Sequence, residues 1–371
     1  MRRVFAIILP LLVAVTACSP RQVQKTTAAQ ELLARLENSV SDGKIMYGHQ
    51  DDLVYGHTWA VEDPATDDFD RSDVKDVTGL YPAVLGLELG GLELGWEKSL
   101  DSVRFASISK AARIHYQRGG IVTLSWHPYN PATGGKAWDI SSSEAVASVL
   151  DGGVKAEMFA LWLQRLGDFL ETFVTDDGAR FPFIFRHWHE HTGSWFWWGR
   201  DLCTKGQYVD LWRKTWHYLV NERGLDNIVW CYSPGAGVDA EGYLERWPGD
   251  EYVDIMGIDC YAYDTVRDTG SVAAASAAFS AQLSDALQMM TGIAVEKGKL
   301  MTVSECGFEG LPDANWWMQA LYPAIKDYPV VYALTWRNAP DRPEHFYAPF
   351  KGYQYENDFI QFCQQEQIEL L

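Results

Sequence analysis

The run FIFRHWHEHTGSWFWWG, residues 183–199, says most about how this chain folds. It begins as an uninterrupted apolar stretch, which is typical of a parallel strand covered by helices rather than of a half-exposed strand. It then changes abruptly to charged and aromatic residues around Glu190. Polar residues at the carboxyl end of a buried strand favour a barrel in which such ends share one face.

Seven further runs of this kind recur along the chain, and segments with helical periodicity lie between them. Residues 26–38 precede the first run and are predicted to close the bottom of a barrel. Eight strand–helix units without a second composition predict a single (β/α)8 TIM barrel over residues 29–371. The other predicted strands are 45–49, 83–87, 121–126, 228–232, 253–258, 300–305 and 331–336, and the predicted helices are 101–117, 157–173, 208–222, 271–297, 314–326 and 356–365.

The composition narrows the class of protein. A formal net charge of -19 over 371 residues repels phosphate backbones, so we expect no nucleic-acid partner. Sixteen tryptophans exceed what a core needs and favour a cleft that stacks on sugar rings. Past residue 18 the five cysteines lack a CxxC pair, so a zinc site or a disulfide scaffold is not expected.

The N-terminus resembles a bacterial export signal. Arg2 and Arg3 precede an apolar stretch, residues 4–15, that is too short to span a bilayer. The sequence VTAC, residues 15–18, resembles a lipobox. It predicts a signal peptide over residues 1–17, lipidation of Cys18 and a polar tether over residues 18–28. We expect an outer-membrane lipoprotein held only by this anchor; a plain secretory signal is the alternative.

Glu190 follows predicted strand 4, residues 183–187, and Glu305 is the last residue of predicted strand 7, so both would face the same cleft. Paired carboxyl groups at strand ends of one barrel are typical of a glycosidase. Glu190, among aromatic residues, is the candidate acid because an apolar setting and a nearby carboxylate raise a pKa. Glu305 is the candidate nucleophile, and Arg186 is placed to keep it ionised.

His187, His189 and His191 allow a metal site as an alternative, because histidine is a common zinc ligand. Only one residue separates each histidine from the next, however, which does not match the HExxH spacing. We therefore expect no metal and no cofactor, and we expect His189 to bind a sugar hydroxyl.

Six short motifs lie at or near the ends of predicted strands: RHWHE (186–190), GSWFWWG (193–199), YGHQ (47–50), SWHP (125–128), DCY (259–261) and SECG (304–307). Taken together, these motifs resemble glycoside hydrolase family 26, the β-mannanase family, over residues 29–371. The resemblance implies a retaining mechanism with Glu190 as acid/base and Glu305 as nucleophile, and a mannan or galactomannan substrate.

The resemblance also implies six substrate-binding or orienting residues around the two glutamates. The loops after predicted strands 2 and 3 do not follow the family pattern, so the distal subsites and a role for Glu88 stay open. The implied residues are His127, Arg186, His189, Trp195, Tyr261 and Trp336.

Three alternatives remain beside a monomeric β-1,4-mannanase. The same mechanism would serve for β-1,3-xylan or mixed-linkage β-glucan, which this family also includes. A barrel without catalysis would serve as a surface glycan-binding protein, although both glutamates are present. A zinc hydrolase is the third.

Overall fold

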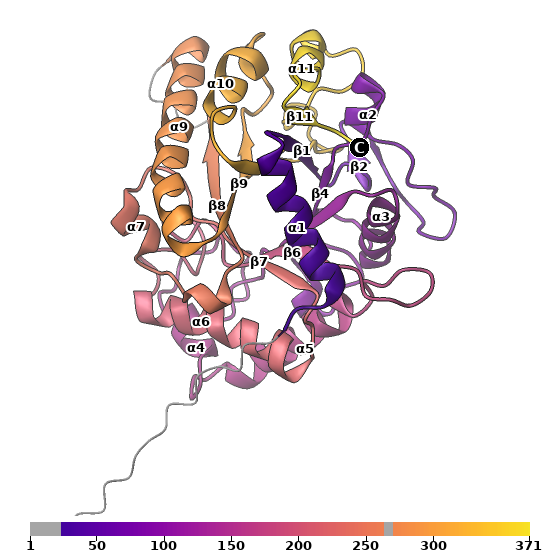
Figure 1. The fold of residues 1–371 in the computed structure, drawn as a ribbon. Coiled ribbons are helices and arrows are strands. Elements are labelled where there is room, and N and C mark those ends of the chain that lie inside the picture. The colour runs from indigo at the N-terminus through magenta and orange to yellow at the C-terminus, as the bar shows by residue number, and fades with distance from the viewer. Residues whose placement is uncertain (1–23, 263–269) are drawn as a thin grey trace, which may run out of the picture.

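The computed structural model describes residues 24–262 and 270–371, and in this part eight parallel strands close into one barrel (Figure 1). β10 pairs with β1, where Met46 lies opposite Tyr332 and His49 lies opposite Thr335. The predicted (β/α)8 barrel is confirmed. The strands are β1 (Ile45–Gln50), β4 (Val84–Glu88), β5 (Ile121–Ser125), β6 (Phe183–Arg186), β7 (Ile228–Tyr232), β8 (Ile255–Tyr261), β9 (Leu300–Gly307) and β10 (Val330–Thr335).

Helices follow most strands and cover the outside of the barrel. Their ends use ordinary caps: the Thr204 side chain accepts from Gln207 N at the start of α6, and Gly298 ends α9 in the left-handed region. The helices are α1 (Thr27–Ser41), α2 (Asp73–Thr78), α3 (Phe105–Gln117), α4 (Ala145–Val149), α5 (Ala156–Leu170), α6 (Lys205–His217), α7 (Ala240–Leu244), α9 (Val272–Lys297), α10 (Tyr322–Ile325) and α11 (Glu356–Cys363).

The short elements sit mainly in the loops and at the barrel rim. A two-residue hairpin stands in the loop after β1, and a short edge strand pairs with β1 at Ile45 and Met46. They are β2 (Tyr55–Gly56), β3 (Trp59–Ala60) and β11 (Ile368–Glu369), the short 3₁₀ helices η1 (Leu92–Leu94) and η3 (Asp250–Tyr252), and the short π-helices η2 (Tyr218–Glu222) and η4 (Trp317–Leu321).

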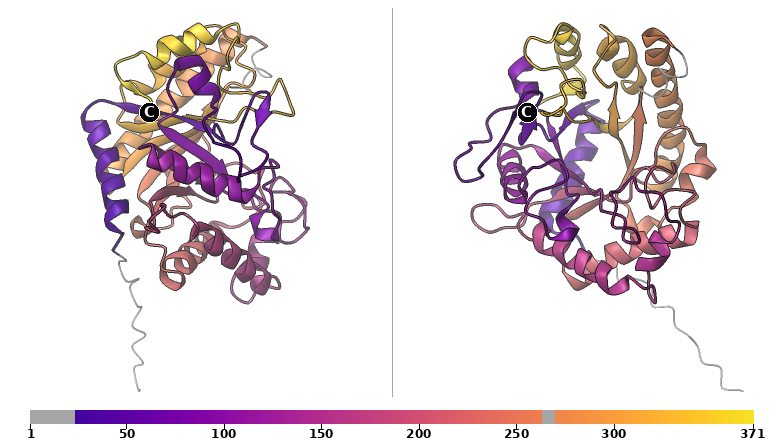
Figure 2. Two further views of the ribbon diagram at one scale, coloured as in Figure 1. Left: turned by 90° about the vertical axis from the view of Figure 1, so that its right-hand side faces the viewer. Right: turned by 180° about the vertical axis from the view of Figure 1, so that it is seen from behind.

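Two buried clusters hold the barrel together. The larger lies between strands and outer helices. The smaller fills the barrel interior and includes Ala29, Leu32 and Leu36 of α1. Helix α1 therefore closes the bottom of the barrel, as predicted, and lies at the end opposite the long loops (Figure 2). The pocket of about 550 Å³ that includes Glu88 and His127 lies at the other end, among the long loops.

Two predicted helices differ from the observed ones. The helix expected over 101–117 begins at Phe105, because Ser102 adopts a φ of 67° and Ser99 N donates to Val103 O in a tight turn. That turn turns Asp101 toward the loop end. The segment expected over 314–326 divides into η4 and α10, because Pro323 at the start of α10 lacks the N–H that a continuous helix needs.

The cysteines and the termini complete the fold. All five cysteines of the described residues are free thiols, and Cys231, Cys260 and Cys306 are buried. Among the described residues, no helix combines the length and apolarity that crossing a membrane requires. Cys18 and the predicted signal peptide lie outside the described residues.

Candidate active site

The backbone after β6 is folded into a strained turn that carries Glu190. Trp188 and Glu190 have φ values of 51° and 52°, a region that costs a side-chain-bearing residue of order 1–3 kcal/mol. The conformation is held from several sides: Tyr208 OH donates to Trp188 O (2.7 Å), and Glu190 N donates to Ser233 O (2.7 Å). This backbone conformation positions the Glu190 carboxyl at the barrel mouth.

Glu190 has the environment of an acid. Burial raises its pKa well above the usual range, and the carboxylates of Glu305 and Asp259 raise it further. Trp195 Nε1 donates to Glu190 Oε2 (2.6 Å), which opposes the shift and fixes the carboxyl orientation. Trp195, for which the resemblance implies substrate binding, thus lies beside the candidate acid, and its side chain is 46% exposed.

Glu305, near the end of β9, has the environment of a carboxylate. Arg186 Nη2 donates to Glu305 Oε1, and Tyr261 OH donates to Glu305 Oε2 (2.7 Å). Both were the predicted partners of Glu305. Burial opposes a charge on Arg186, but Asp259 and Glu305 raise the pKa of its guanidinium, so the cation is retained.

Asp259, on β8, is a site residue to which the sequence analysis gave no role. Its carboxylate accepts from Arg186 Nη1 (3.0 Å) and from the hydroxyls of Ser233 and Ser304 (2.8 Å each). Burial raises the pKa of Asp259 to about 7, although Arg186 lowers it. Asp259 thereby holds the guanidinium that holds Glu305. It directly follows predicted strand 6, so its position at a strand end was the available signal.

The two catalytic candidates lie close together. Carboxylate oxygens of Glu190, Asp259 and Glu305 lie within 4.8 Å of one another. Among the described residues this is the group that meets the geometry of a metal site. Arg186 already donates to two of the three, however, so a cation would have to displace the guanidinium. The arrangement suits two carboxyl groups with opposite protonation better than a metal.

The histidines of the run after β6 do not converge. His187 packs on Phe185 and Trp212, and His191 packs on Tyr208 and Tyr232. These two rings are buried in the layer between strands and helices. Of these three histidines, His187 and His191 therefore point into the protein interior, and His189 lies beside His127. The three rings do not form the cluster that the zinc alternative needs.

His189 meets a second charged pair at the barrel mouth. His127 Nδ1 donates to Glu88 Oε2 (2.8 Å), and the Nε2 atoms of His127 and His189 are 3.0 Å apart. Burial opposes charge on His127, but Glu88 raises its pKa; burial, Arg186 and His127 lower the pKa of His189. The raised pKa of His127 favours the form in which its ring donates to Glu88 and to His189 at once. Glu88, left open from sequence, is the anchor of this pair.

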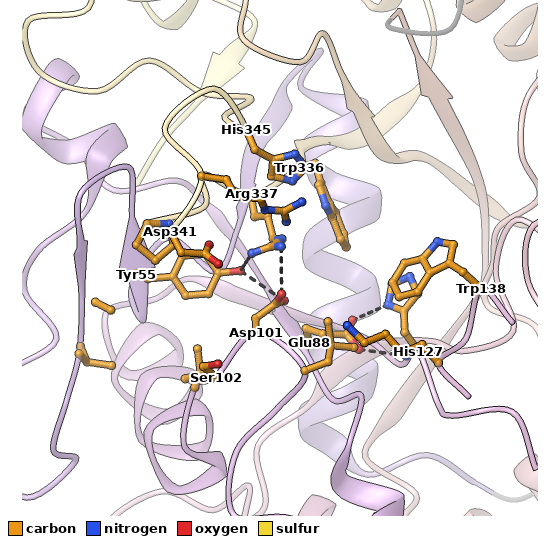
Figure 3. Close-up of a pocket in the computed structure, with 17 residues that line it drawn as sticks. Tyr55, Glu88, Asp101, Ser102, His127, Trp138, Trp336, Arg337, Asp341 and His345 are labelled. Atoms are coloured by element: carbon orange, nitrogen blue, oxygen red, sulfur yellow. Dashed lines mark hydrogen bonds and ion pairs between the residues drawn. The ribbon is translucent and has the colours of Figure 1, made fainter. Parts of the chain in front are cut away.

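A pocket of about 550 Å³ extends from this pair along the barrel mouth (Figure 3). Trp336 and Trp138 flank it, and Trp138 stacks on His127 with 12° between the rings. Arg337 forms an ion pair with Asp101 (3.0 Å) at the far side. Of these residues, only Trp336 and His127 were predicted as site residues from the sequence.

Tyr55 completes the far side of the pocket. Arg337 Nη1 donates to Tyr55 OH (3.2 Å), which donates to Asp51 Oδ2 (2.8 Å). Arg337 follows predicted strand 8 directly and carried a positional signal. Asp101 and Tyr55 carried none, because loops from distant parts of the sequence bring them together.

A parallel barrel closed at the bottom, with two neighbouring carboxyl groups at its mouth, one of them bound by an arginine, and an aromatic pocket beside them, is typical of a glycoside hydrolase. The sequence profile of glycosyl hydrolase family 26 matches residues 21–327. The chain belongs to this family and is an enzyme of the type to which mannan endo-1,4-β-mannosidases belong.

The relatives have the same fold over most of this chain. A family 26 β-mannanase structure from Bacteroides ovatus is 40% identical, covers 93% of this chain and 95% of its own, and has a TM-score of 0.86. An endo-β-1,4-mannanase structure from Cellulomonas fimi is 32% identical, with coverages of 94% and 76% and a TM-score of 0.81. A mannan endo-1,4-β-mannosidase of Bifidobacterium adolescentis is 31% identical over 92% of this chain. This chain spans about a third (34%) of the length of that relative.

Proposed function

We propose that this chain cleaves β-1,4-mannosidic bonds in mannan or galactomannan with retention of configuration. The observation that carries the proposal is the short separation of two carboxyl groups with different partners, Glu190 beside Trp195 and Glu305 bound by Arg186. Their nearest oxygens lie within 4.8 Å. Retaining glycosidases hold the two groups about 5–5.5 Å apart, and inverting ones leave room for a water between them. The names of the relatives supply mannan as the substrate.

In the first step, Glu305 attacks the anomeric carbon while Glu190 gives its proton to the leaving oxygen. Arg186 and Tyr261 hold Glu305 in place for this attack. When the covalent bond forms, Glu305 loses its negative charge. Because that charge raises the pKa of Glu190, its loss lowers the pKa. Glu190 is then prepared to accept a proton from the incoming water in the second step.

The stereochemistry of the first product tests this mechanism. Proton NMR during hydrolysis of a mannooligosaccharide should show the β-anomer of the new reducing end before mutarotation. A first-formed α-anomer would mean inversion and would refute the double displacement.

The sugar is tested separately. Linear mannan, galactomannan, β-1,3-xylan and mixed-linkage β-glucan should be compared at equal enzyme concentration. We expect the highest kcat/KM on the mannans. A preference for xylan or glucan would keep the mechanism and replace the substrate, whereas binding without any cleavage would favour a glycan-binding protein.

We also propose that the mature chain is attached to the outer membrane through a lipid on Cys18. The support is the basic and apolar leader followed by a lipobox-like VTAC. Labelled fatty acid should enter the native protein, and a Cys18→Ala variant should leave the membrane fraction with unchanged kinetics on soluble mannan. A native protein that takes up no label would restore the plain secretory signal.

A further inference from the structure

One aromatic pair at the loop end of the barrel, an exposed tryptophan and a partly buried tyrosine, has no part in the site described above. Trp96 is 47% exposed, as much as Trp138 and Trp195, but it does not line the pocket and does not contact Glu190. It meets Tyr129 edge to face, with ring centroids 5.1 Å apart and 71° between the planes. The pair, Trp96 and Tyr129, is called the outer platform below.

The loop after β4 is built to hold Trp96 in place. Gly91 and Gly95 have φ values of 95° and 75°, which other residues rarely adopt, and the turn η1 lies between them. A Cβ on Gly91 would come within 3.0 Å of the Trp96 ring. The indole therefore packs against backbone that carries no side chain, and a side chain at position 91 would have to displace it.

A buried carboxyl ties the two halves of the outer platform together. Glu93 is fully buried; its Oε2 accepts from Gly91 N (3.0 Å) and Trp126 Nε1 (3.1 Å), and its Oε1 accepts from Tyr129 N (2.8 Å). One side chain thus connects the backbone under Trp96 to the backbone of Tyr129. A buried charge-bearing group is costly, so its use here indicates that the relative position of the two loops matters.

The outer platform is also joined to the pocket by the same loop. Leu100 and Asp101, four and five residues after Trp96, line the pocket, and Leu100 N donates to Gly90 O (2.8 Å) across the base of the loop. A polysaccharide that occupies the pocket can therefore extend to the outer platform.

We propose that Trp96 and Tyr129 bind a stretch of the polysaccharide substrate outside the catalytic cleft. Two rings at a steep angle offer one face for stacking on the apolar C–H side of a pyranose and an edge for a neighbouring sugar. This assignment of the ligand rests on the proposed function. The platform would hold the enzyme on polymeric or insoluble mannan and would contribute nothing to cleaving a short oligosaccharide.

The test compares binding and turnover in Trp96→Ala, Tyr129→Ala and the control Leu161→Ala, which removes an equally exposed apolar side chain from α5. Binding is measured by sedimentation with insoluble mannan in a Glu305→Ala background, so that the matrix is not consumed. We expect both platform variants to reduce retention about tenfold, which corresponds to about 1.4 kcal/mol. The control should bind as the parent does, and thermal melts should show that all variants fold.

Turnover separates the outer platform from the cleft. Trp96→Ala should keep kcat/KM on soluble mannotetraose and lose rate on insoluble mannan. Unchanged retention of both platform variants would overturn the proposal, and so would an equal loss on mannotetraose, because the platform would then belong to the cleft. A parent enzyme that cleaves no mannan at all would instead refute the proposed function, whatever the retention data show.

Discussion

The Glu305 carboxylate controls the protonation of its neighbour Glu190. It is the largest charge effect on that group after burial and acts upward on the pKa. Glu305→Gln removes the charge and keeps the shape, so the pKa of Glu190 should fall. Carbon NMR of labelled glutamate, with Glu190→Gln to assign the signal, would measure the change. An unchanged pKa of Glu190 would show that the two carboxyl groups are not coupled and would contradict the proposed mechanism.

Glu190 itself should be needed most in the second step. An aryl mannoside with a good leaving group needs little acid assistance, so Glu190→Ala should still form the covalent intermediate and then stall. Azide attacks without a base and should restore turnover, giving the β-mannosyl azide. In the matched Glu305→Ala variant, any azide product should have the α configuration. An α-azide from Glu190→Ala would exchange the two roles.

Asp259 acts through Arg186 and not on substrate. Asp259→Asn keeps the shape but removes the charge that holds the Arg186 guanidinium. Arg186 would then be paired with Glu305 alone and would no longer be held from the Asp259 side. Because Arg186 orients the nucleophile, we expect kcat to fall about tenfold or more with little change in KM. A control, Ser233→Ala, removes only one hydrogen bond to Asp259 and should cost less. An increase in KM alone would show that Asp259 serves substrate binding.

Glu93, which connects the loops after β4 and β5, should make the stability of the protein depend on pH. Burial raises the pKa of Glu93 to about 7, against its N–H donors, whereas an unfolded glutamate titrates near about 4.3. Between these values the folded state keeps a proton that the unfolded chain has released, so stability should fall as pH rises. Denaturant unfolding of Glu93→Gln should show a flatter pH slope in this range. An identical slope would exclude Glu93 as the titrating group.

The elements that the sequence predicted well are those that a local pattern determines. Continuous apolar runs located the eight strands to within a few residues, and Glu190 and Glu305 could be found because each follows such a run. Asp101 could not, because helical periodicity extends through it while an ion pair with Arg337 favours a turn. Arg337 lies 236 positions later in the chain, and a local sequence pattern cannot reveal a contact between residues so far apart.

At the level of the whole molecule, α1 contributes to stability at one end of the barrel, and the catalytic residues lie at the other end. It closes the end of the barrel that lies away from Glu190 and Glu305, with Leu36 fully buried against the barrel interior. Leu36→Ala leaves a cavity there and should lower the free energy of unfolding by about 2–5 kcal/mol. Leu33, one turn earlier and only partly buried against the same cluster, is the matched control, and its replacement should cost clearly less.

Activity should respond differently from stability in these two variants. The catalytic carboxyl groups are held by β6, β8 and β9 and by the loops at the other end, so kcat/KM well below the melting temperature should stay at the parent value. Unfolding curves and initial rates on the same preparations measure both quantities. A loss of kcat/KM in Leu36→Ala, at a temperature where the variant is fully folded, would mean that packing at the closed end sets the geometry of the strand tips.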